Sequence, residues 1–298
     1  MVGSAILRQL SATGAQIFGV PREQLDLRHQ NAVEAFVREH RPDDIVLAAA
    51  TVGGIAANQA RPADFLQDNL LIATHVMAAA HAHNVERLLY VASSAVYPRD
   101  APQPMPEEAL LTGPLEPTHE GYAIAKIAGI KLAESYRRQH GRDYFSVLPT
   151  NLYGRGDNFN PETSHVIPAL IRKAHTAKLA GDAHITIWGS GQARREFLHA
   201  DDCAAACVHL LLESAVDAPM FNLGSGEETT ILELTQLVCD AVGFQGEIRT
   251  DPSQPSGPDR KRLDCRRLLA TGWAPTIALK DGLASTYASF LERSAGNG

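Results

Sequence analysis

Tyr122 and Lys126 are the residues of this sequence whose types and spacing most clearly suggest chemistry. Four residues make about one helical turn, so both side chains leave a helix on the same face. An ammonium group beside a phenol favours the ionised phenol and lowers its pKa. The tyrosine could then exchange a proton with a carbonyl or alkoxide while a nicotinamide exchanges a hydride. Alone, the pattern Tyr-x-x-x-Lys also describes an ordinary pair on an exposed helix.

Ser93 favours a catalytic role for Tyr122 and Lys126 over an ordinary pair on an exposed helix. It stands with Ser94 about thirty residues before Tyr122, at the end of the apolar run Leu88–Ala92. A serine at the carboxyl end of a strand is well placed to hydrogen-bond the same substrate oxygen. Ser93, Tyr122 and Lys126 in this order resemble the catalytic triad of the short-chain dehydrogenase/reductase superfamily.

The elements that must position these residues alternate along the first half of the chain. We expect buried strands at Gln16–Val20, Ile45–Ala50, Leu88–Ala92 and Phe145–Leu148. We expect helices at Asn31–His40, Pro62–Asn84 and Glu120–Gly141, with Pro62 at a helix start and Gly141 at a C-cap. Such alternation predicts right-handed crossovers and an α/β fold with a Rossmann-like, doubly wound parallel sheet.

The composition changes after Thr150, which predicts two parts. Residues 1–150 would form a Rossmann-like, dinucleotide-binding domain, and residues 151–298 mainly a smaller substrate lobe with some segments returning to the main sheet. In the second part we expect polar loops at Asn151–Glu162 and Asp251–Lys261 and a strand at Ile185–Trp188. We expect helices at His165–Lys178, Ala200–Leu212 and Ile231–Val242.

The first residues fit the end of a Gly-rich turn and the helix after it, with Gly3 as the last glycine of that turn. The first strand of a Rossmann sheet has no counterpart here, although it lies at the centre of the usual strand order. We therefore hypothesise that the natural protein starts upstream, and the alternative is a fold that starts here. An upstream reading frame that encodes no such strand and turn would contradict the hypothesis.

Bulk properties exclude several classes of function. The chain has 298 residues, 45% of them hydrophobic, and a net charge of −7, which argues against a nucleic-acid or membrane-surface role. No stretch is apolar enough for a transmembrane helix, and the start lacks the features of a signal peptide. The four cysteines show no metal-ligand spacing, so we predict reduced packing residues, no metal and a cytoplasmic location.

Several longer stretches resemble the GDP-L-fucose synthase family over nearly the whole chain. They include Leu47–Ile55, Pro117–Lys131, Pro149–Gly154, Asp157–Phe159, Ser164–Leu170 and Trp188–Gly191. The resemblance implies NADPH-dependent conversion of GDP-4-keto-6-deoxy-D-mannose to GDP-L-fucose, by epimerisation at C3 and C5 and then reduction at C4.

The resemblance assigns residues to both stages of this reaction. Ser93 would polarise the C4 ketone, Tyr122 would protonate the alkoxide, and Lys126 would assist Tyr122 and hold the nicotinamide ribose. For epimerisation the family uses a Cys and a His, and His165 matches the His. The Cys position is Ala95, which cannot carry a proton.

The resemblance also implies ligand contacts. Cofactor-binding residues would be Gly3, Arg22, Ala49, Tyr122, Lys126, Pro149, Asn151, Leu152 and His165. Arg22 takes the place where NAD enzymes carry an acidic residue, so a 2′-phosphate and NADP are favoured. Substrate-binding residues would be Lys173, Trp188, Arg195, Arg260 and Lys261.

Three functions remain open on the sequence. The first is the complete synthase, the second is a C4 reductase without epimerisation because of Ala95, and the third is a non-catalytic nucleotide-sugar binder. Product stereochemistry separates the first two. We also predict a homodimer formed through Glu120–Gly141 and Pro62–Asn84, because the latter helix carries an apolar face that needs a cover.

Overall fold

A parallel four-stranded sheet forms the centre of the molecule. The computed structural model describes residues 1–161, 163–212, 217–254 and 259–296. The sheet has the order β1-β2-β3-β7, made by β1 (Asp44–Leu47), β2 (Arg87–Val91), β3 (Asp143–Pro149) and β7 (Met220–Leu223). The registers pair Leu89 with Phe145 and Val147 with Phe221. These side chains are buried, as expected for strands covered on both faces.

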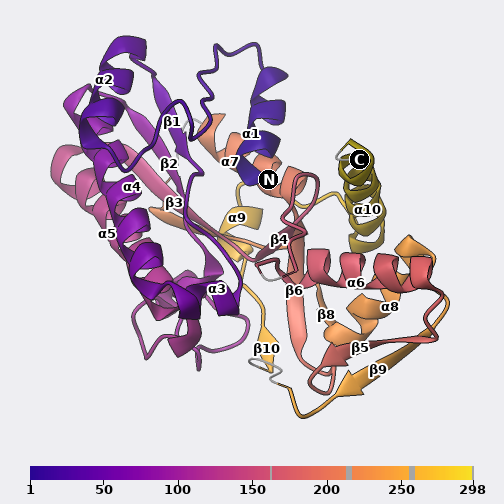
Figure 1. Cartoon of the computed structure of the whole chain (residues 1–298). Helices are drawn as coiled ribbons and strands as arrows, with labels where there is room; N and C mark the ends of the chain where they lie inside the picture. The colour runs from indigo at the N-terminus through magenta and orange to yellow at the C-terminus, as the bar shows by residue number, and fades with distance from the viewer. Residues whose placement is uncertain (162, 213–216, 255–258, 297–298) are drawn as a thin grey trace.

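Helices cover both faces of this sheet, as Figure 1 shows. One face carries α2 (Gln30–His40), α4 (Pro62–Ala82) and α5 (Glu120–His140), and the other carries α1 (Val2–Ser11) and α7 (Ala200–Leu212). Pro62 begins α4, and Gly141 caps α5 with a positive φ of 67°, as its type and position predicted. The predicted Rossmann-like α/β fold is confirmed.

A second group of elements packs around its own apolar cluster. It contains α6 (Val166–Ala180), β5 (His184–Trp188), α8 (Ile231–Val242), β9 (Glu247–Asp251) and α10 (Leu279–Gly296). Between this group and the main sheet lies a small sheet of β4 (Asn151–Tyr153), β6 (Arg194–His199), β8 (Glu228–Thr230) and β10 (Arg260–Lys261). Between β6 and β8 the chain returns to the main sheet through β7, which pairs with β3.

Short elements complete the described chain. They are α3 (Ile55–Ala60), the 3₁₀ turns η1 (Ser94–Val96), η2 (Glu107–Ala109) and η3 (Pro117–His119), and α9 (Arg266–Leu269). Of these, η1 and η3 lie against α5, which carries Tyr122, and α3 lies against η3.

The predicted strand Gln16–Val20 does not form. The segment is irregular and largely exposed, and β1 pairs with β2 on one edge only. A strand is stable when a neighbour accepts and donates its backbone hydrogen bonds, and an open cavity separates this segment from β1. The apolar pattern therefore has no partner with which to make a ladder.

The two predicted loops of the second half also need correction. Asn151–Tyr153 is not loop but strand β4, which pairs with Phe197–His199 of β6. Within Asp251–Lys261, Asp251 ends β9 and Arg260–Lys261 pairs with Arg194–Arg195. Residues 162 and 255–258 of these two segments lie outside the described residues. Pairing between distant segments gives such short strands their stability, so local composition is a poor guide to them.

Candidate active site

Ser93 stands at the carboxyl end of β2, where the chain turns into η1. Its hydroxyl oxygen accepts a hydrogen bond from the backbone N–H of Ala95 at 3.1 Å, which fixes the turn. The Ser93 side chain also lies close enough to the Tyr122 hydroxyl for this polar contact to lower the pKa of that phenol. The strand end and the helix α5 thus bring two predicted catalytic residues into contact.

Burial dominates the protonation of the Tyr122–Lys126 pair. It raises the pKa of Tyr122 to about 12, and it lowers the pKa of Lys126 to about 7. The expectation that the Lys126 ammonium lowers the Tyr122 pKa is wrong for the chain on its own. The Lys126 Nζ atom donates to the Val91 carbonyl at 2.8 Å and lies 5.9 Å from the centre of the Tyr122 ring. Tyr122 is therefore protonated at neutral pH and is a proton donor.

Gly129 lets α5 approach the sheet closely enough to bury Lys126. A Cβ atom at this position would lie 2.5 Å from the Tyr90 ring, far inside van der Waals contact. The Tyr90 ring in turn lies 4.7 Å from the Lys126 ammonium, a distance typical of a cation–π contact. One glycine on the helix thus sets the depth of the catalytic lysine.

A single large cavity collects most of the predicted site residues. It measures about 2380 Å³, more than the 300–1,000 Å³ typical of small-molecule pockets, and has room for a dinucleotide and a nucleotide sugar. Its lining includes Gly3, Arg22, Ala49, Ser93, Tyr122, Lys126, Pro149, Asn151, Leu152, His165, Lys173, Trp188, Arg195 and Lys261. It also runs along the open edge of β1.

The nicotinamide end of a cofactor fits the residues around Tyr122. The Lys126 ammonium, the exposed Ala49 after β1 and the half-buried Leu152 all face the same cavity. Asn151 is held by its side-chain N–H donating to the Glu196 carbonyl at 2.9 Å. At the other end, the first turn of α1 opens on the cavity, and a Cβ atom added at Gly3 would meet no neighbouring side chain or loop within 4 Å, so an anionic group could meet backbone N–H groups there.

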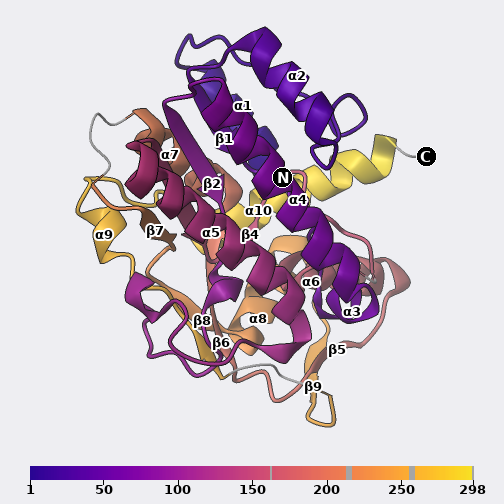
Figure 2. The same ribbon diagram turned by 90° about the vertical axis from the view of Figure 1, so that its left-hand side faces the viewer.

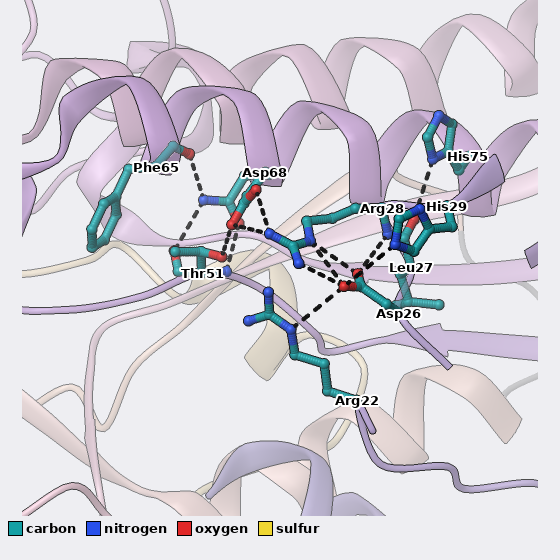
Figure 3. Close-up of polar contacts among 10 residues, drawn as sticks. Arg22, Asp26, Leu27, Arg28, His29, Thr51, Phe65, Asp68 and His75 are labelled. Carbon is teal, nitrogen blue, oxygen red and sulfur yellow. Dashed lines mark hydrogen bonds and ion pairs between the residues drawn. The ribbon is translucent and has the colours of Figure 1, made fainter. Parts of the chain in front are cut away.

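Arg22 lies at the rim of the cavity on the irregular segment before α2. Its Nε atom is 3.8 Å from Asp26, and 60% of its side chain is exposed. Figure 3 shows Arg28 holding the same carboxylate and reaching Asp68 on α4 at 3.1 Å. Asp68 also accepts from the Thr51 hydroxyl at 2.9 Å. This network ties the Arg22 segment to α4 and to the loop after β1.

Arg195 and Lys261 form a pair of cations on neighbouring strands. They face each other in the register of β6 and β10. Burial and the Arg195 charge lower the pKa of Lys261 to about 8, and burial lowers the pKa of Arg195. Two cations are brought together in this way where an anion such as a diphosphate is to be bound.

The other three predicted substrate residues are placed differently. Trp188 ends β5 with 65% of its surface exposed, so its ring is open to a ligand. The Lys173 ammonium donates to the Thr186 carbonyl at 2.6 Å, on the cavity side of α6. Arg260 forms a two-pronged ion pair with Glu228 at 2.6–2.9 Å and is absent from the cavity lining, so the structure does not bring it together with the others.

His165 precedes the first residue of α6 and is exposed to the cavity. Ala95 lies in η1, directly after Ser94, on the side of the cavity formed by the main sheet. His165, the predicted acid/base residue, and Ala95, where the second acid/base side chain is missing, therefore line the same cavity. They come from different halves of the chain.

Two polar residues in or beside the cavity were not identified from the sequence. His119 precedes α5, lines the cavity and lies in polar contact with the backbone of Ala95. Its position three residues before Tyr122 could have indicated that it lies near the site. Glu196 is a fully buried carboxylate that accepts from the N–H groups of Gly226 and Leu263 at 2.8 and 2.9 Å, which ties β6 to the segments that follow β7 and β10. Nothing in the local sequence marks it.

Within the described part of the chain, no helix has the length and apolar character to cross a membrane. The same residues contain no cluster of three or more His, Cys, Asp or Glu side chains arranged to hold a metal ion. All four cysteines are free and buried, as predicted for packing residues.

The fold and the Ser93–Tyr122–Lys126 site define a class of nucleotide-dependent enzymes. The model of the NAD dependent epimerase/dehydratase family matches residues 1–224, and the chain belongs to that family. It is therefore an enzyme of the oxidoreductase/epimerase type with a nicotinamide cofactor.

Relatives with known names narrow this class. The chain is 51% identical over 293 residues to "Putative GDP-L-fucose synthase 2" of Arabidopsis thaliana, covering 98% of this chain and 89% of the relative. It is 50% identical over 303 residues to the GDP-L-fucose synthase of Escherichia coli strain K12, covering 98% and 94%. The resemblance found in the sequence is thus confirmed.

Solved structures agree with this relationship. A GDP-mannoheptose C4 reductase from Campylobacter jejuni with NADP bound has 34% identity and a TM-score of 0.88, covering 97% of this chain and 95% of that one. A GDP-L-fucose synthetase from Naegleria fowleri bound to NADP has 25% identity and a TM-score of 0.88, covering 99% and 92%.

Proposed function

We propose that this protein converts GDP-4-keto-6-deoxy-D-mannose to GDP-L-fucose with NADPH. The observation that carries the proposal is one cavity that joins a Ser–Tyr–Lys site to a pair of cations and an exposed tryptophan. The identity of about half to named GDP-L-fucose synthases over nearly the whole chain supports this substrate. We extend the proposal to a two-part organisation, with residues 1–150 mainly for the cofactor and 151–298 mainly for the nucleotide sugar.

NADP is the proposed cofactor, and NADPH supplies the hydride when bound. Arg22 and the N-terminus of α1 would hold its phosphates, Lys126 its nicotinamide ribose, and Ala49, Pro149, Asn151 and Leu152 the nicotinamide side. The NADP-bound structures among the relatives support this choice over NAD. The pairing of Arg22 with Asp26 at 3.8 Å is loose enough for a 2′-phosphate to take over the guanidinium.

In the reductive stage the residues around the C4 ketone act on its oxygen. Ser93 donates a hydrogen bond to that oxygen, which draws negative charge onto it. Tyr122 then gives its proton to the alkoxide, and its high pKa keeps that proton available at neutral pH. Arg195 and Lys261 hold the diphosphate, and Trp188 packs against the nucleotide sugar.

A C4 reductase without epimerisation is the alternative that Ala95 favours. One solved relative, 34% identical to this chain, is named as a GDP-mannoheptose C4 reductase, and that name mentions a reduction but no epimerisation. The higher identity to named synthases, about 50%, favours the complete reaction.

Product stereochemistry tests the proposal directly. The protein is incubated with GDP-4-keto-6-deoxy-D-mannose and NADPH, and the product is identified by NMR. We expect one NADPH oxidised for each GDP-L-fucose, and a loss of rate of about 10²–10⁴-fold in Tyr122→Phe. A C4 alcohol with the configuration at C3 and C5 retained would replace the proposal by the alternative. No NADPH oxidation by the wild-type protein would refute both.

We also propose a cytoplasmic homodimer. The buried free cysteines fit a reducing compartment. Helices α4 and α5 lie side by side on one outer face, as Figure 2 shows, and Ile124 of α5 leaves 44% of its surface exposed. Two such faces would cover each other about a twofold axis.

A further inference from the structure

His119 is a titratable residue that lines the cavity and has no role in the reaction steps given above. It ends η3 and directly precedes α5, three residues before Tyr122. Its ring lies close enough to the backbone carbonyl of Ala95 for this polar contact to raise its pKa, and Ala95 is the residue whose side chain carries no acid or base. The imidazole therefore lies against the position where the proton-transfer group is missing.

A chain of polar groups supports the His119 ring from behind. The Nδ1 atom lies 3.2 Å from the Thr118 hydroxyl, and that hydroxyl donates to the Glu116 carboxylate at 3.1 Å. A carboxylate linked to one ring nitrogen orients an imidazole and stabilises the imidazolium that forms when the other nitrogen takes a proton.

Burial keeps the His119 ring neutral at pH 7. It lowers the pKa of His119, and the Lys261 charge lowers it further, while Glu116 and the Ala95 carbonyl oppose this less strongly. The neighbouring elements α3 and η1 contain no titratable side chain. A neutral imidazole can accept a proton, so the electrostatic surroundings match the role of a general base.

We propose that His119 replaces the missing acid/base residue and, with His165, forms the proton-transfer pair that epimerises the sugar. The proposal rests on the proposed function, because it needs a C4 ketone beside the carbon that inverts. In the tautomer that carries the ring proton on Nδ1, where the Thr118 oxygen accepts it, Nε2 has a free lone pair and turns from the Ala95 carbonyl to the sugar. The C–H bond next to the ketone breaks, its proton passes to His119 Nε2, and the electron pair forms an enolate on C4. A new C–H bond then forms on the opposite face with a proton from His165. No redox change accompanies this exchange.

Deuterium uptake without NADPH isolates this stage. The protein is incubated with GDP-4-keto-6-deoxy-D-mannose in D₂O, and mass spectrometry follows deuterium in the sugar. The same preparations are assayed for oxidation of GDP-L-fucose by NADP⁺ in the reverse direction, which needs Ser93, Tyr122 and Lys126 but no proton transfer at carbon. For His119→Asn we expect the ratio of uptake to reverse oxidation to fall about 10²–10⁴-fold.

A matched control and a second variant test whether the loss of deuterium uptake is specific to the His119 ring. His29→Asn removes an exposed histidine outside the cavity lining and should keep the wild-type ratio. Thr118→Val breaks the link between Glu116 and the ring, and should shift the pH dependence of uptake without shifting that of reverse oxidation.

Three results would overturn the proposal. One is uptake by His119→Asn at the wild-type rate, and another is an equal loss of both activities, which would show a structural role. The third is a wild-type protein that oxidises NADPH with the keto sugar but takes up no deuterium. A wild-type protein that neither exchanges nor reduces would instead refute the proposed function itself, and this inference with it.

Discussion

Lys126 gains its low pKa by losing water rather than by meeting another charge. Burial holds the pKa near 7 in the folded protein, compared with 10.5 for an ordinary lysine. Between these values the unfolded chain binds more protons than the folded one, so the free energy of unfolding must rise with pH. We expect a rise between about pH 7 and pH 9 in wild-type protein that is smaller in Lys126→Met. Urea unfolding at each pH measures it.

A control for this prediction lies one turn further along the same helix. Lys131 is exposed and pairs with Glu134 at 2.8 Å, so Lys131→Met should keep the wild-type dependence on pH. An identical slope in the Lys126→Met protein would mean that the ammonium is solvated in solution.

Lys261 predicts a pH dependence of substrate binding. Its pKa of about 8 in the free protein is lowered by burial and by Arg195, and a bound diphosphate would raise it. Binding then requires the protonated ammonium, so the KM for the GDP-sugar should rise as the pH increases above about 8. In Lys261→Met the KM should be higher at pH 7 and lose this dependence. A wild-type KM that stays constant up to pH 9.5 would argue against the cation pair as the diphosphate site.

Among the elements, the contact of α5 with β2 depends on one glycine. Gly129→Ala would push the helix away from the Tyr90 ring, since a Cβ atom there has only 2.5 Å of space. We expect a loss of about 1–3 kcal/mol in the free energy of unfolding, together with reduced reductase activity, because Lys126 moves with the helix.

A double-mutant cycle checks the cause of that loss. In a Tyr90→Leu background the ring is gone, so Gly129→Ala should cost clearly less than in the wild type. Equal costs in both backgrounds would mean that helix propensity or another contact, and not the ring, decides the effect.

Most elements could be predicted from the sequence because their signals are local. The bounds of α7 and α8 match the predicted ranges, and Pro62 and Gly141 mark helix ends by their own conformational limits. The predictions of a strand at Gln16–Val20 and of a loop at Asn151–Tyr153 were wrong, because the structure of these segments is not decided locally. Strand formation there depends on whether a distant segment is present to pair with, which an apolar pattern does not reveal.

At the scale of the whole molecule, the residues of the cavity come from segments far apart in the chain. Family-like motifs allowed Ser93, Tyr122, His165 and Lys261 to be named in advance, and all of them line the cavity. His119 could not be singled out, because its closeness to Ala95 arises only when η3 folds back on η1. Arg260 was predicted beside the substrate, but its pairing with Glu228 depends on the register of β6, β8 and β10.

The proposed homodimer makes a prediction at the same scale. Analytical ultracentrifugation at micromolar concentration should give twice the chain mass of 32.1 kDa. Ile124→Lys places a charge on the outer face of α5 and should shift the equilibrium toward the monomer, whereas Leu179→Lys on the exposed side of α6 should not. A wild-type monomer under these conditions would contradict the dimer.

In the proposed reaction, one cavity performs both proton exchange at carbon and reduction at C4. The most direct measurement is the position of isotopes in the product made from GDP-4-keto-6-deoxy-D-mannose and NADPH in D₂O, read by NMR. We expect GDP-L-fucose with deuterium at C3 and C5 and with protium, delivered from NADPH, at C4. A reduced sugar with protium at C3 and C5 and the starting configuration would contradict it, and would mean that only the Ser93–Tyr122–Lys126 half of the site is active.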